Sequence, residues 1–320
     1  MKALQFNDYG DTSVLHWTPL PMVNPGPDQV LILVKAASIN PTDCKIRSGV
    51  IRFPGSDHFP KSMGMDFAGI VAKKGENVTH LKDGDKVMGY MGTNGGSFAD
   101  CMIAPSENTF LIPGKLTYEQ ATTLPMNAGT AIKVVNDYLK PSAGKTIFIN
   151  GATGGIGLFA VQLCKLAGAI VTATAGNTEG SQILHDLGTD QVIDYHVVDI
   201  LKTGGKWDAI LDASGNMDFE QGKEILTEYG EFSTMVPKGD PSLPGRTFGT
   251  KKERLVFAQP GPTEFLELQD LVYKGKIRTF ISQIFSMSDA IDTLQQFELG
   301  TLRGIGKVVL INDGKNLDCG

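Results

Sequence analysis

The clearest pattern of hydrophobic and polar positions lies between residues 146 and 169. Thr146 to Asn150 form a short apolar run, which is typical of a strand that a parallel sheet buries on both faces. From Ile156 onward apolar residues recur at helical spacing, and Gln162 and Lys165 fall on a polar side. The pattern therefore predicts a buried strand followed by an amphipathic helix with one polar face.

A glycine-rich turn joins this strand to the helix. Gly151 opens the turn, and Gly154, Gly155, Ile156 and Gly157 lead into the helix. Gly154 has no side chain to hold a diphosphate away from the backbone, and Gly157 allows close packing of helix on strand. The free amides and positive end of the helix would then face the anion. The residues from Gly154 to Gly157 are predicted cofactor contacts, and a purely structural turn is the alternative.

The chain after this helix continues to alternate between strand and helix patterns. Strands are predicted over residues 169–175, 190–195, 207–215, 230–236 and 254–259, and helices over 181–187 and 219–227. A βαβαβ unit of this kind indicates a parallel sheet with helices packed on it.

Residues 1 to about 120 have a different pattern. Short apolar segments separated by glycine, proline and aspartate predict strands over residues 1–6, 30–40, 67–75, 85–90 and 97–104. This pattern predicts a β-rich, barrel-like domain. Residues 119–139 are helical with a break at Pro125, and the end of the chain predicts helices over 264–274 and 289–299 and strands over 279–285 and 306–311.

Composition limits the classes of partner. A chain of 320 residues exceeds the usual size of one domain, so two domains are expected. The net charge of −6 argues against nucleic acid or an anionic membrane as the main partner. The polar start predicts no signal peptide, and the four cysteines are far apart without CxxC spacing. We therefore expect a cytoplasmic protein with reduced thiols.

Several segments, taken in order, carry a family resemblance. They are the glycine turn and the runs 37–49, 64–71, 83–90, 124–131 and 306–310. With them the chain resembles the medium-chain dehydrogenase/reductase superfamily, and most closely its zinc-free quinone oxidoreductase branch, which includes alkenal/one oxidoreductase-like members.

The resemblance implies an α/β protein with two domains. A GroES-like catalytic domain would comprise residues 1–120 and be completed by 261–320, and a Rossmann cofactor-binding domain would comprise 121–260. A cleft between the two domains would hold the nicotinamide. Residues 48–62 and 91–96 are expected to be loops that line it.

The positions that would hold a catalytic zinc differ from those of zinc alcohol dehydrogenases. The resemblance places Asn40 where those enzymes have cysteine, and Met65 and Asp66 where they have histidine and glutamate. Asparagine and methionine are poor ligands for tetrahedral zinc, so we expect no zinc. Without a Lewis acid, hydride transfer to the conjugated C=C of an enone or enal, or to a quinone, is favoured over alcohol oxidation.

Such a reaction needs groups that stabilise the developing negative charge on the acceptor oxygen. Asn40 is the first candidate, because its amide donates without needing a particular protonation state. Lys45 is the second, and the resemblance places it where quinone oxidoreductases often have tyrosine; a solvated surface lysine is the alternative. Asp43 is expected to order the local turn or to pair with Arg47.

Other cofactor contacts follow from the resemblance. Thr130 matches a threonine beside the nicotinamide, Ser214 lies at the end of the fourth strand of the parallel sheet, and Lys307 resembles a position beside the cofactor. A helix packing residue and a surface lysine are the alternatives for Thr130 and Lys307.

The end of the second strand of the parallel sheet favours NADPH over NADH. An acidic residue usually receives the ribose hydroxyls of NAD there, but this chain has Ala175, Gly176 and Asn177. Asn177 and Tyr195 are the predicted contacts of the 2′-phosphate, while Gly180 stands where relatives have a phosphate-binding lysine.

Three functions therefore remain open: a reductase of small-molecule carbonyl compounds or quinones, an enoyl-thioester reductase, and a non-catalytic nucleotide-binding scaffold. The resemblance also predicts a homodimer that pairs through the strand at 254–259.

Overall fold

A computed structural model describes residues 1–52, 58–235, 246–256, 260–302 and 304–312. The chain divides into two compact units, each with its own strands and core. The first unit comprises residues 1–126, 261–273 and 279–320, and the second comprises 127–260 and 274–278.

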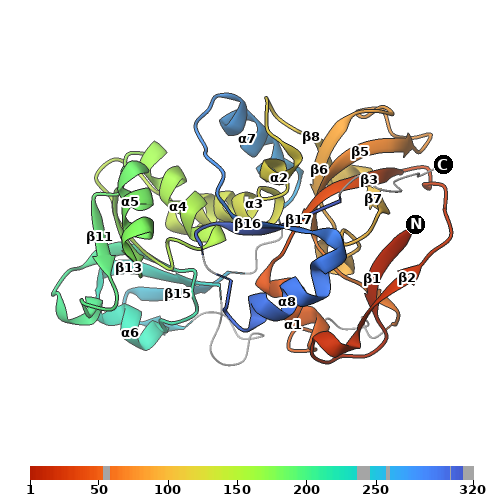
Figure 1. Cartoon of the computed structure of the whole chain (residues 1–320). Coiled ribbons are helices and arrows are strands. Elements are labelled where there is room, and N and C mark those ends of the chain that lie inside the picture. Colours follow the sequence, from red (N-terminus) through yellow and green to blue (C-terminus); the bar gives the residue numbers. More distant parts are fainter. Residues whose placement is uncertain (53–57, 236–245, 257–259, 303, 313–320) are drawn as a thin grey trace. The chain divides into compact units, whose positions relative to one another are not determined.

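A parallel sheet forms the centre of the second unit (Figure 1). Its parallel strands are β9 (Thr146–Asn150), β10 (Ile170–Ala175), β11 (Gln191–Asp194), β12 (Trp207–Asp212), β13 (Leu226–Thr234) and β15 (Lys251–Leu255). They lie in the order β11-β10-β9-β12-β13-β15, which is the strand order of a doubly wound dinucleotide-binding fold. The short strand β14 (Thr247–Phe248) pairs antiparallel with β15 at the outer edge.

Helices cover both faces of this sheet. Figure 1 shows α4 (Gly155–Leu166) and α5 (Thr178–Asp186) on one face and α6 (Phe219–Glu224) on the other. The helix α3 (Pro125–Val134) enters the second unit at Asn127 and continues into a π-helical turn over Val135–Leu139.

The helix α4 is not amphipathic in the way that the sequence pattern predicts. Its residues from Gly157 to Cys164 are all buried. Gln162, expected on a polar face, is only 5% exposed, and its side chain bonds the backbone of Arg278 at distances of 3.2 and 2.7 Å. The prediction that Gln162 lies on an exposed polar face is wrong. Its amide is buried because the backbone of Arg278 supplies its hydrogen-bond partners.

One hydrophobic cluster of the second unit lies on the α6 side of the sheet. Phe148 of β9 and Trp207 of β12 have ring centroids 5.2 Å apart, and Phe219 of α6 packs on Phe232 of β13 at 6.2 Å. The helix α6 begins at Phe219 because Asp218 caps it by accepting from the backbone amide of Gln221.

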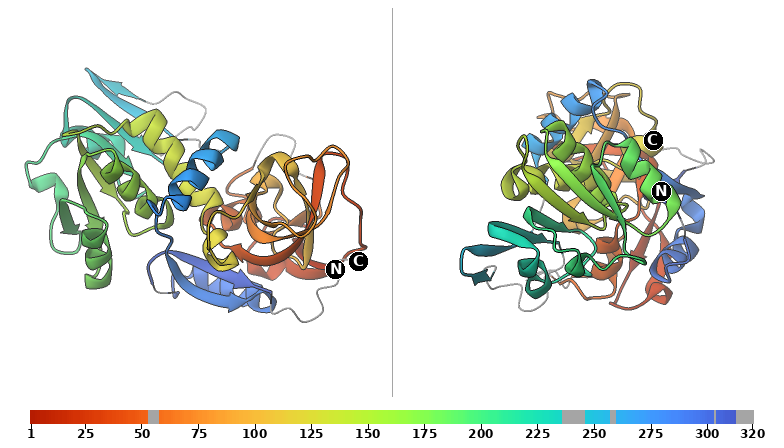
Figure 2. Two further views of the ribbon diagram at one scale, coloured as in Figure 1. Left: turned by 90° about the horizontal axis from the view of Figure 1, so that it is seen from above. Right: turned by 90° about the vertical axis from the view of Figure 1, so that its left-hand side faces the viewer.

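The first unit is β-rich, and Figure 2 shows its strands curving around a common interior. One sheet has the order β16-β17-β3-β5-β6-β8, with β7 also paired to β3, and a second has the order β2-β1-β4. The strands are β1 (Lys2–Phe6), β2 (Leu15–Pro19), β3 (Gln29–Ser38), β4 (Lys61–Ser62), β5 (Asp66–Lys74), β6 (Lys86–Tyr90), β7 (Cys101–Pro105), β8 (Thr109–Leu111), β16 (Ile281–Ser286) and β17 (Lys307–Ile311).

The late part of the chain therefore supplies two strands to the sheet of the first unit. The helices of this unit are α1 (Pro41–Arg47), α2 (Tyr118–Ala121), α7 (Pro262–Tyr273) and α8 (Ala290–Glu298). The strand β17 pairs antiparallel with β3, which joins the two ends of the sequence in one sheet.

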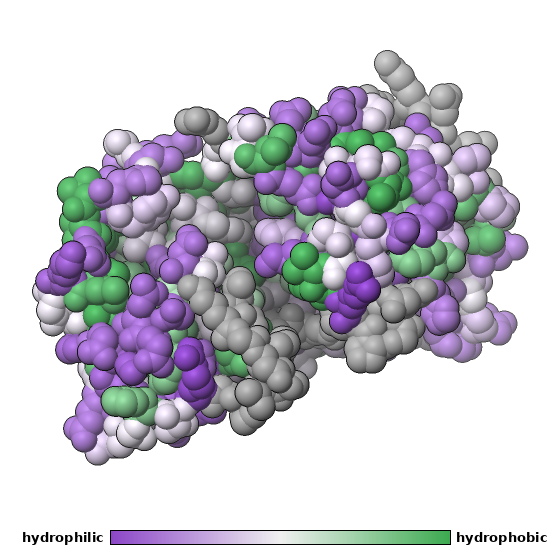
Figure 3. Space-filling view, turned by 90° about the horizontal axis from the view of Figure 1, so that it is seen from below, coloured by the Kyte–Doolittle hydropathy of each residue, from purple (hydrophilic) through white to green (hydrophobic). Residues whose placement is uncertain are grey.

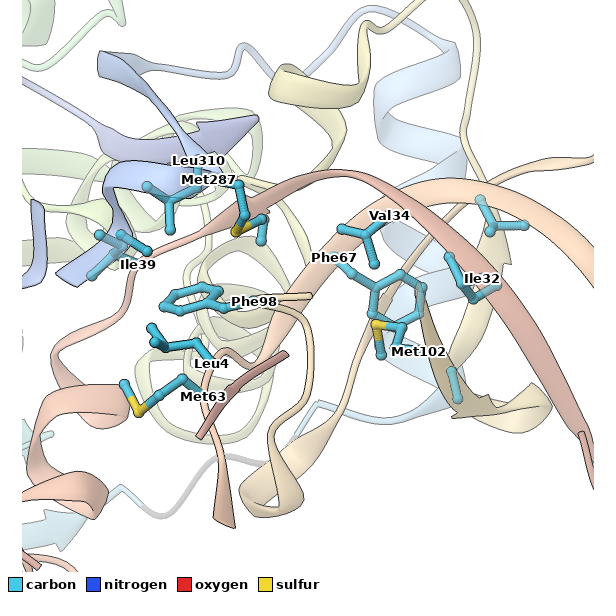
Figure 4. Packing of buried hydrophobic residues seen from close by; sticks show 14 of the residues in the cluster. Leu4, Ile32, Val34, Ile39, Met63, Phe67, Phe98, Met102, Met287 and Leu310 are labelled. Carbon is cyan, nitrogen blue, oxygen red and sulfur yellow. The ribbon is translucent and has the colours of Figure 1, made fainter. Parts of the chain in front are cut away.

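Buried side chains from distant segments form the core of the first unit (Figure 4). Phe98 lies near Leu4 and Met63, and the backbone hydrogen bonds from Leu4 N to Phe98 O and from Met63 N to Leu4 O hold these three segments together at 2.8 and 2.9 Å. Met287 and Leu310, from the late part of the chain, belong to the same cluster.

The α/β class with a β-rich unit and a parallel-sheet unit is confirmed. The sequence pattern missed β2 and α1, and the predicted strand ends at residue 236 and over 257–259 lie outside the described residues.

Cys44 and Cys164 are free and buried, but Cys101 is disulfide-bonded, so the expectation of four reduced thiols is wrong. Wide spacing along the sequence does not show which cysteines the fold brings together.

Hydrophilic and hydrophobic residues are interspersed on the face shown in Figure 3. No helix within the described ranges is both long enough and apolar enough to cross a membrane.

Candidate active site

The glycine turn of the second unit lies at the point where the strand order reverses, between β9 and β12. Gly151 follows β9 with a φ of +76°, and a Cβ built on it would lie 2.9 Å from Cβ of Ser214, which follows β12. Only glycine fits both the backbone angle and the space. The turn and Ser214 therefore meet at the carboxyl edge of the sheet, where such folds bind ligands.

A hydrogen-bond network holds these strand ends together. The amide of Asn150 donates to Asp212 and to Ser214, both at 3.0 Å, and accepts from the hydroxyl of Thr174 at 3.1 Å. Thr174 in turn accepts from the backbone amide of Gly151 at 3.0 Å. The network fixes the start of the turn, and Ser214 acts in it as a structural partner.

The first turn of α4 has an accessible backbone. Gly154 is the N-cap residue, and a Cβ built on it would meet only the carbonyl oxygen of Gly151, at 3.3 Å. A Cβ on Gly157 would lie 2.4 Å from that same oxygen and 2.7 Å from Cα of Ala152. Gly157 thus permits close packing within the turn, whereas Gly154 leaves the helix amides open to an anion.

Asn127 was not identified by the sequence pattern, although it lies beside this turn. A Cβ on Gly155 would lie 2.3 Å from Nδ2 of Asn127. Asn127 is 5% exposed, and its Nδ2 is a buried donor without a hydrogen-bond partner among the residues that the structure describes. An unsatisfied buried donor is costly in the free protein, and a bound group with acceptor oxygens would satisfy it. The open backbone of Gly154 and this donor fit the diphosphate of a dinucleotide.

The ends of β10 and β11 bring together the predicted phosphate contacts. Asn177 is the N-cap of α5, and its side chain accepts from the amide of Gly180 at 2.7 Å. A Cβ on Gly176 would lie 2.1 Å from the hydroxyl of Tyr195, so that ring covers the end of β10. His196 follows, with its ring centroid 4.4 Å from that of Tyr195.

Thr130, the remaining predicted contact in the second unit, is fully buried in α3. The predicted cofactor residues at the strand ends therefore share one edge of the sheet, while Thr130 lies on a separate helix.

The register of three strands builds a polar cluster in the first unit. Ser38 of β3 pairs with Asp66 of β5 on one side and with Val309 of β17 on the other. Continuing the antiparallel register by two residues places Lys307 opposite Asn40, directly after the end of β3. Residues far apart in the sequence are thus brought together by strand pairing.

Asn40 lies at the centre of this cluster and is 1% exposed. Its Nδ2 donates to Asp66 at 2.9 Å, and its Oδ1 accepts from Nζ of Lys307 at 2.5 Å. Nζ of Lys307 also donates to the carbonyl of Ile39 at 2.7 Å and lies 3.8 Å from the Asp66 carboxylate. Asp66 further accepts from the hydroxyl of Ser38 at 2.9 Å.

Burial shifts the pKa values of the charged groups in this cluster. It raises the pKa of Asp66, although Lys307 and the donors around Asp66 oppose the shift. It lowers the pKa of Lys307, and the two carboxylates Asp66 and Asp43 oppose that shift. Burial raises the pKa of Asp43 to about 7, helped by the charge of Asp66.

The helix α1 begins at this cluster and carries the second catalytic candidate. Asp43 accepts from the backbone amide of Asn40 at 2.8 Å, so it orders the turn as expected. It does not pair with Arg47, whose buried guanidinium instead contacts Glu298 and donates to the carbonyl of Gly10 at 3.1 Å. Lys45 lies on α1 and is half-buried.

The described residues contain no group of three or more histidine, cysteine, aspartate or glutamate side chains arranged to hold a metal ion. At the positions where zinc dehydrogenases have ligands, Met65 is 2% exposed, and the two Asp66 oxygens accept from Asn40 and from the backbone amide of Met126. This set of donors does not suit zinc.

Comparison with known proteins agrees with this architecture. A family model described as the alcohol dehydrogenase GroES-like domain matches residues 26–114, and one described as zinc-binding dehydrogenase matches residues 155–271. The chain belongs to the medium-chain dehydrogenase/reductase superfamily, in its quinone oxidoreductase branch.

Three relatives illustrate the likeness. The chain is 33% identical to the chloroplast envelope quinone oxidoreductase homolog of Arabidopsis thaliana, over 91% of this chain and 93% of that protein. It is 31% identical to 2-methylene-furan-3-one reductase of Solanum lycopersicum, over 97% and 79% of the two chains. The quinone oxidoreductase structure from Coxiella burnetii superimposes with a TM-score of 0.84 at 30% identity, covering 97% and 99%.

Proposed function

We propose that this protein is an NADPH-dependent, zinc-free reductase that transfers a hydride to the conjugated C=C of an enone or enal, or to a quinone. The observation that carries the proposal is the turn at the start of α4, where Gly154 has an open backbone and the next residue, Gly155, lies against Nδ2 of Asn127, a buried donor with no partner within the described ranges. Relatives named as a quinone oxidoreductase homolog and as a furanone reductase support the class of acceptor.

The choice of NADPH is supported by the end of β10. Gly176 and Asn177 provide no carboxylate there, and a carboxylate would repel a 2′-phosphate. Tyr195 lies over Gly176, and the Nδ2 of Asn177 remains a potential donor while its Oδ1 caps α5. These contacts provide hydrogen-bond donors for the phosphate in place of an ion pair, with the carboxylates of Asp194 and Glu179 in the neighbouring elements.

The chemistry is divided between the cofactor and the protein. A bound reduced nicotinamide supplies the hydride. The residues of the chain must bind and orient the acceptor and stabilise the oxygen on which negative charge develops. Lys45 is the cationic candidate for this task, and Asn40 is the neutral one because one hydrogen of its Nδ2 is not used by Asp66.

The proposal that zinc is absent rests on the donor set. An amide and a thioether replace thiolate and imidazole at Asn40 and Met65, and Asp66 already accepts several hydrogen bonds. Metal analysis of the purified protein tests this point, and one tightly held zinc per chain would contradict it.

Dimerisation and location extend the proposal. The family commonly pairs cofactor domains through an edge strand, and the outer edge of this sheet is formed by β15 and the short β14. We therefore propose a homodimer through this edge, in the cytoplasm, without nucleic acid or membrane as a partner. Light scattering of the purified protein measures its mass in solution, and the mass of a single chain would contradict the proposed dimer.

Turnover assays test the function. The protein is incubated with NADPH or NADH and with small enals, long-chain enones, quinones and an enoyl thioester, and cofactor oxidation is followed by absorbance. We expect oxidation of NADPH with an enone, enal or quinone. Turnover only with the thioester would support an enoyl-thioester reductase. Nucleotide binding without turnover of any acceptor would support a non-catalytic nucleotide-binding scaffold.

A further inference from the structure

Lys307 is a predicted cofactor contact, and its amino group bonds to residues of the first unit. The residue is 6% exposed, and Nζ donates to the carbonyl of Ile39 and to Oδ1 of Asn40 at 2.7 and 2.5 Å. The side chain thus links the start of β17 to the segment between β3 and α1, which lies 267 residues earlier in the sequence.

These contacts determine how the amide of Asn40 is oriented. Lys307 has only donors, so the atom of Asn40 that faces it must be the oxygen. Asp66 has acceptors on the other side, at 2.9 Å, so the atom that faces it must be the nitrogen. A flipped amide would place a donor against a donor and an oxygen against a carboxylate.

The orientation turns Nδ2 of Asn40 towards two carboxylates, Asp66 and Asp43. Asp66 accepts one N–H of that group at 2.9 Å, and the other N–H makes a weaker contact with the Asp43 carboxylate, which the acceptor oxygen would replace. A donor that acts on Oδ1 also polarises the amide, which strengthens the remaining N–H as a donor.

We propose that Lys307 is a positioning residue for the reduction: it orients and polarises Asn40, so that the second N–H of Asn40 meets the acceptor oxygen in place of the Asp43 carboxylate, and it does not bind the cofactor. This inference rests on the proposed function, because it assigns Asn40 to that oxygen. Lys307 then acts only through Asn40.

The same contacts also contribute to stability, so the test must separate the two roles. Removing one member of a buried charged cluster is generally destabilising, because its partners lose their compensation. A loss of activity in a Lys307 variant is therefore not sufficient, and the effect must depend on the presence of Asn40.

A double-mutant cycle measures that dependence. The wild type, Lys307→Met, Asn40→Ala and the double variant are compared by kcat with a saturating acceptor and by the Kd of NADPH from fluorescence. We expect Lys307→Met to lower kcat by about tenfold to a hundredfold, as for other losses of positioning, and to change the Kd by less than about twofold. The double variant should be no slower than Asn40→Ala alone.

Each other outcome has a definite meaning. Additive losses in the double variant, or a Kd for NADPH raised by about tenfold with kcat unchanged, would overturn the inference and return Lys307 to the cofactor site. A wild type that reduces no acceptor would overturn the proposed function as well. If Lys307→Met does not fold, as judged by circular dichroism, Lys307→Gln is used. Its amide retains a donor for Asn40, so kcat should stay within about threefold of the wild type, and a loss as large as that of Asn40→Ala would overturn the inference.

Discussion

A Cβ on Gly155 would lie 2.3 Å from the amide nitrogen of Asn127, which is closer than two such atoms can approach. This contact explains why the first residue of α4 must be glycine although its backbone angle does not require glycine. The same geometry holds the buried donor of Asn127 against the first turn of α4.

Gly155→Ala should therefore lower the stability of the protein, by about 1–3 kcal/mol, because the added methyl overpacks a buried site. Adding Asn127→Ala removes the clash and should restore much of the lost melting temperature. It should not restore NADPH affinity, because it also removes the donor. Thermal unfolding and fluorescence titration of both variants check this, and restored affinity in the double variant would count against Asn127 as a ligand.

Gly154→Ala is expected to weaken NADPH binding with little loss of stability, in contrast to Gly155→Ala. Its φ of −78° is allowed for alanine, and its Cβ would meet only one carbonyl, at 3.3 Å, so the folded state should tolerate it. The methyl would instead occupy the open side of the turn. We expect NADPH to bind at least about tenfold more weakly, equivalent to roughly 1.4 kcal/mol, with little change in melting temperature. Unchanged affinity would contradict the location of the diphosphate.

Asn177→Asp should shift the cofactor preference towards NADH. Aspartate is as good an N-cap as asparagine, so α5 should remain capped. The new carboxylate would repel a 2′-phosphate, and we expect the ratio of kcat/KM for NADPH to that for NADH to fall by about tenfold or more.

The control for this charge change is Gln191→Glu, at the opposite end of β11. It adds the same charge to the same sheet away from the strand ends that carry Tyr195. An equal shift in both variants would indicate a general effect of charge and not a contact at Asn177.

Lys45→Met should reduce turnover if the ammonium of Lys45 stabilises the acceptor oxygen. Methionine keeps most of the apolar stem, so α1 should be retained. General acid and electrostatic groups contribute about 10²-fold or more to such steps, and we expect kcat to fall by that order. Lys82→Met, an exposed lysine of the same unit, is the matched control. Equal activity of the two variants would leave Lys45 as a surface residue.

The fold was more predictable from the sequence than the site. Buried apolar runs such as Thr146 to Asn150 identify strands locally, and the glycine turn fixes the order of strand and helix. The cluster around Asn40 depends on the register of β17, β3 and β5, which no local pattern reveals. Lys307 stays a predicted cofactor contact, and its hydrogen-bond partner Asn40 is one that no local pattern reveals.

Asp43 should make the stability of the protein depend on pH near neutrality. Burial raises its pKa to about 7, so between about pH 4 and pH 7 the folded state holds a proton that the unfolded state has lost. The stability from this proton is complete below the pKa of the unfolded chain and is lost as the pH rises through 7. The free energy of unfolding should decrease by roughly 1 kcal/mol per pH unit for one such proton.

Asp43→Asn isolates this contribution, because asparagine can still accept from the amide of Asn40 but does not titrate. Asp66 and Lys307, the charged groups nearest to Asp43, are present in both proteins, so their own titration cancels to first order. Urea unfolding at pH 5, 6, 7 and 8 should give a flatter profile for Asp43→Asn than for the wild type or for Asp8→Asn, an exposed aspartate of the same unit. Parallel profiles for all three proteins would show that the Asp43 carboxyl is charged throughout this range, and that the turn before α1 tolerates a buried carboxylate.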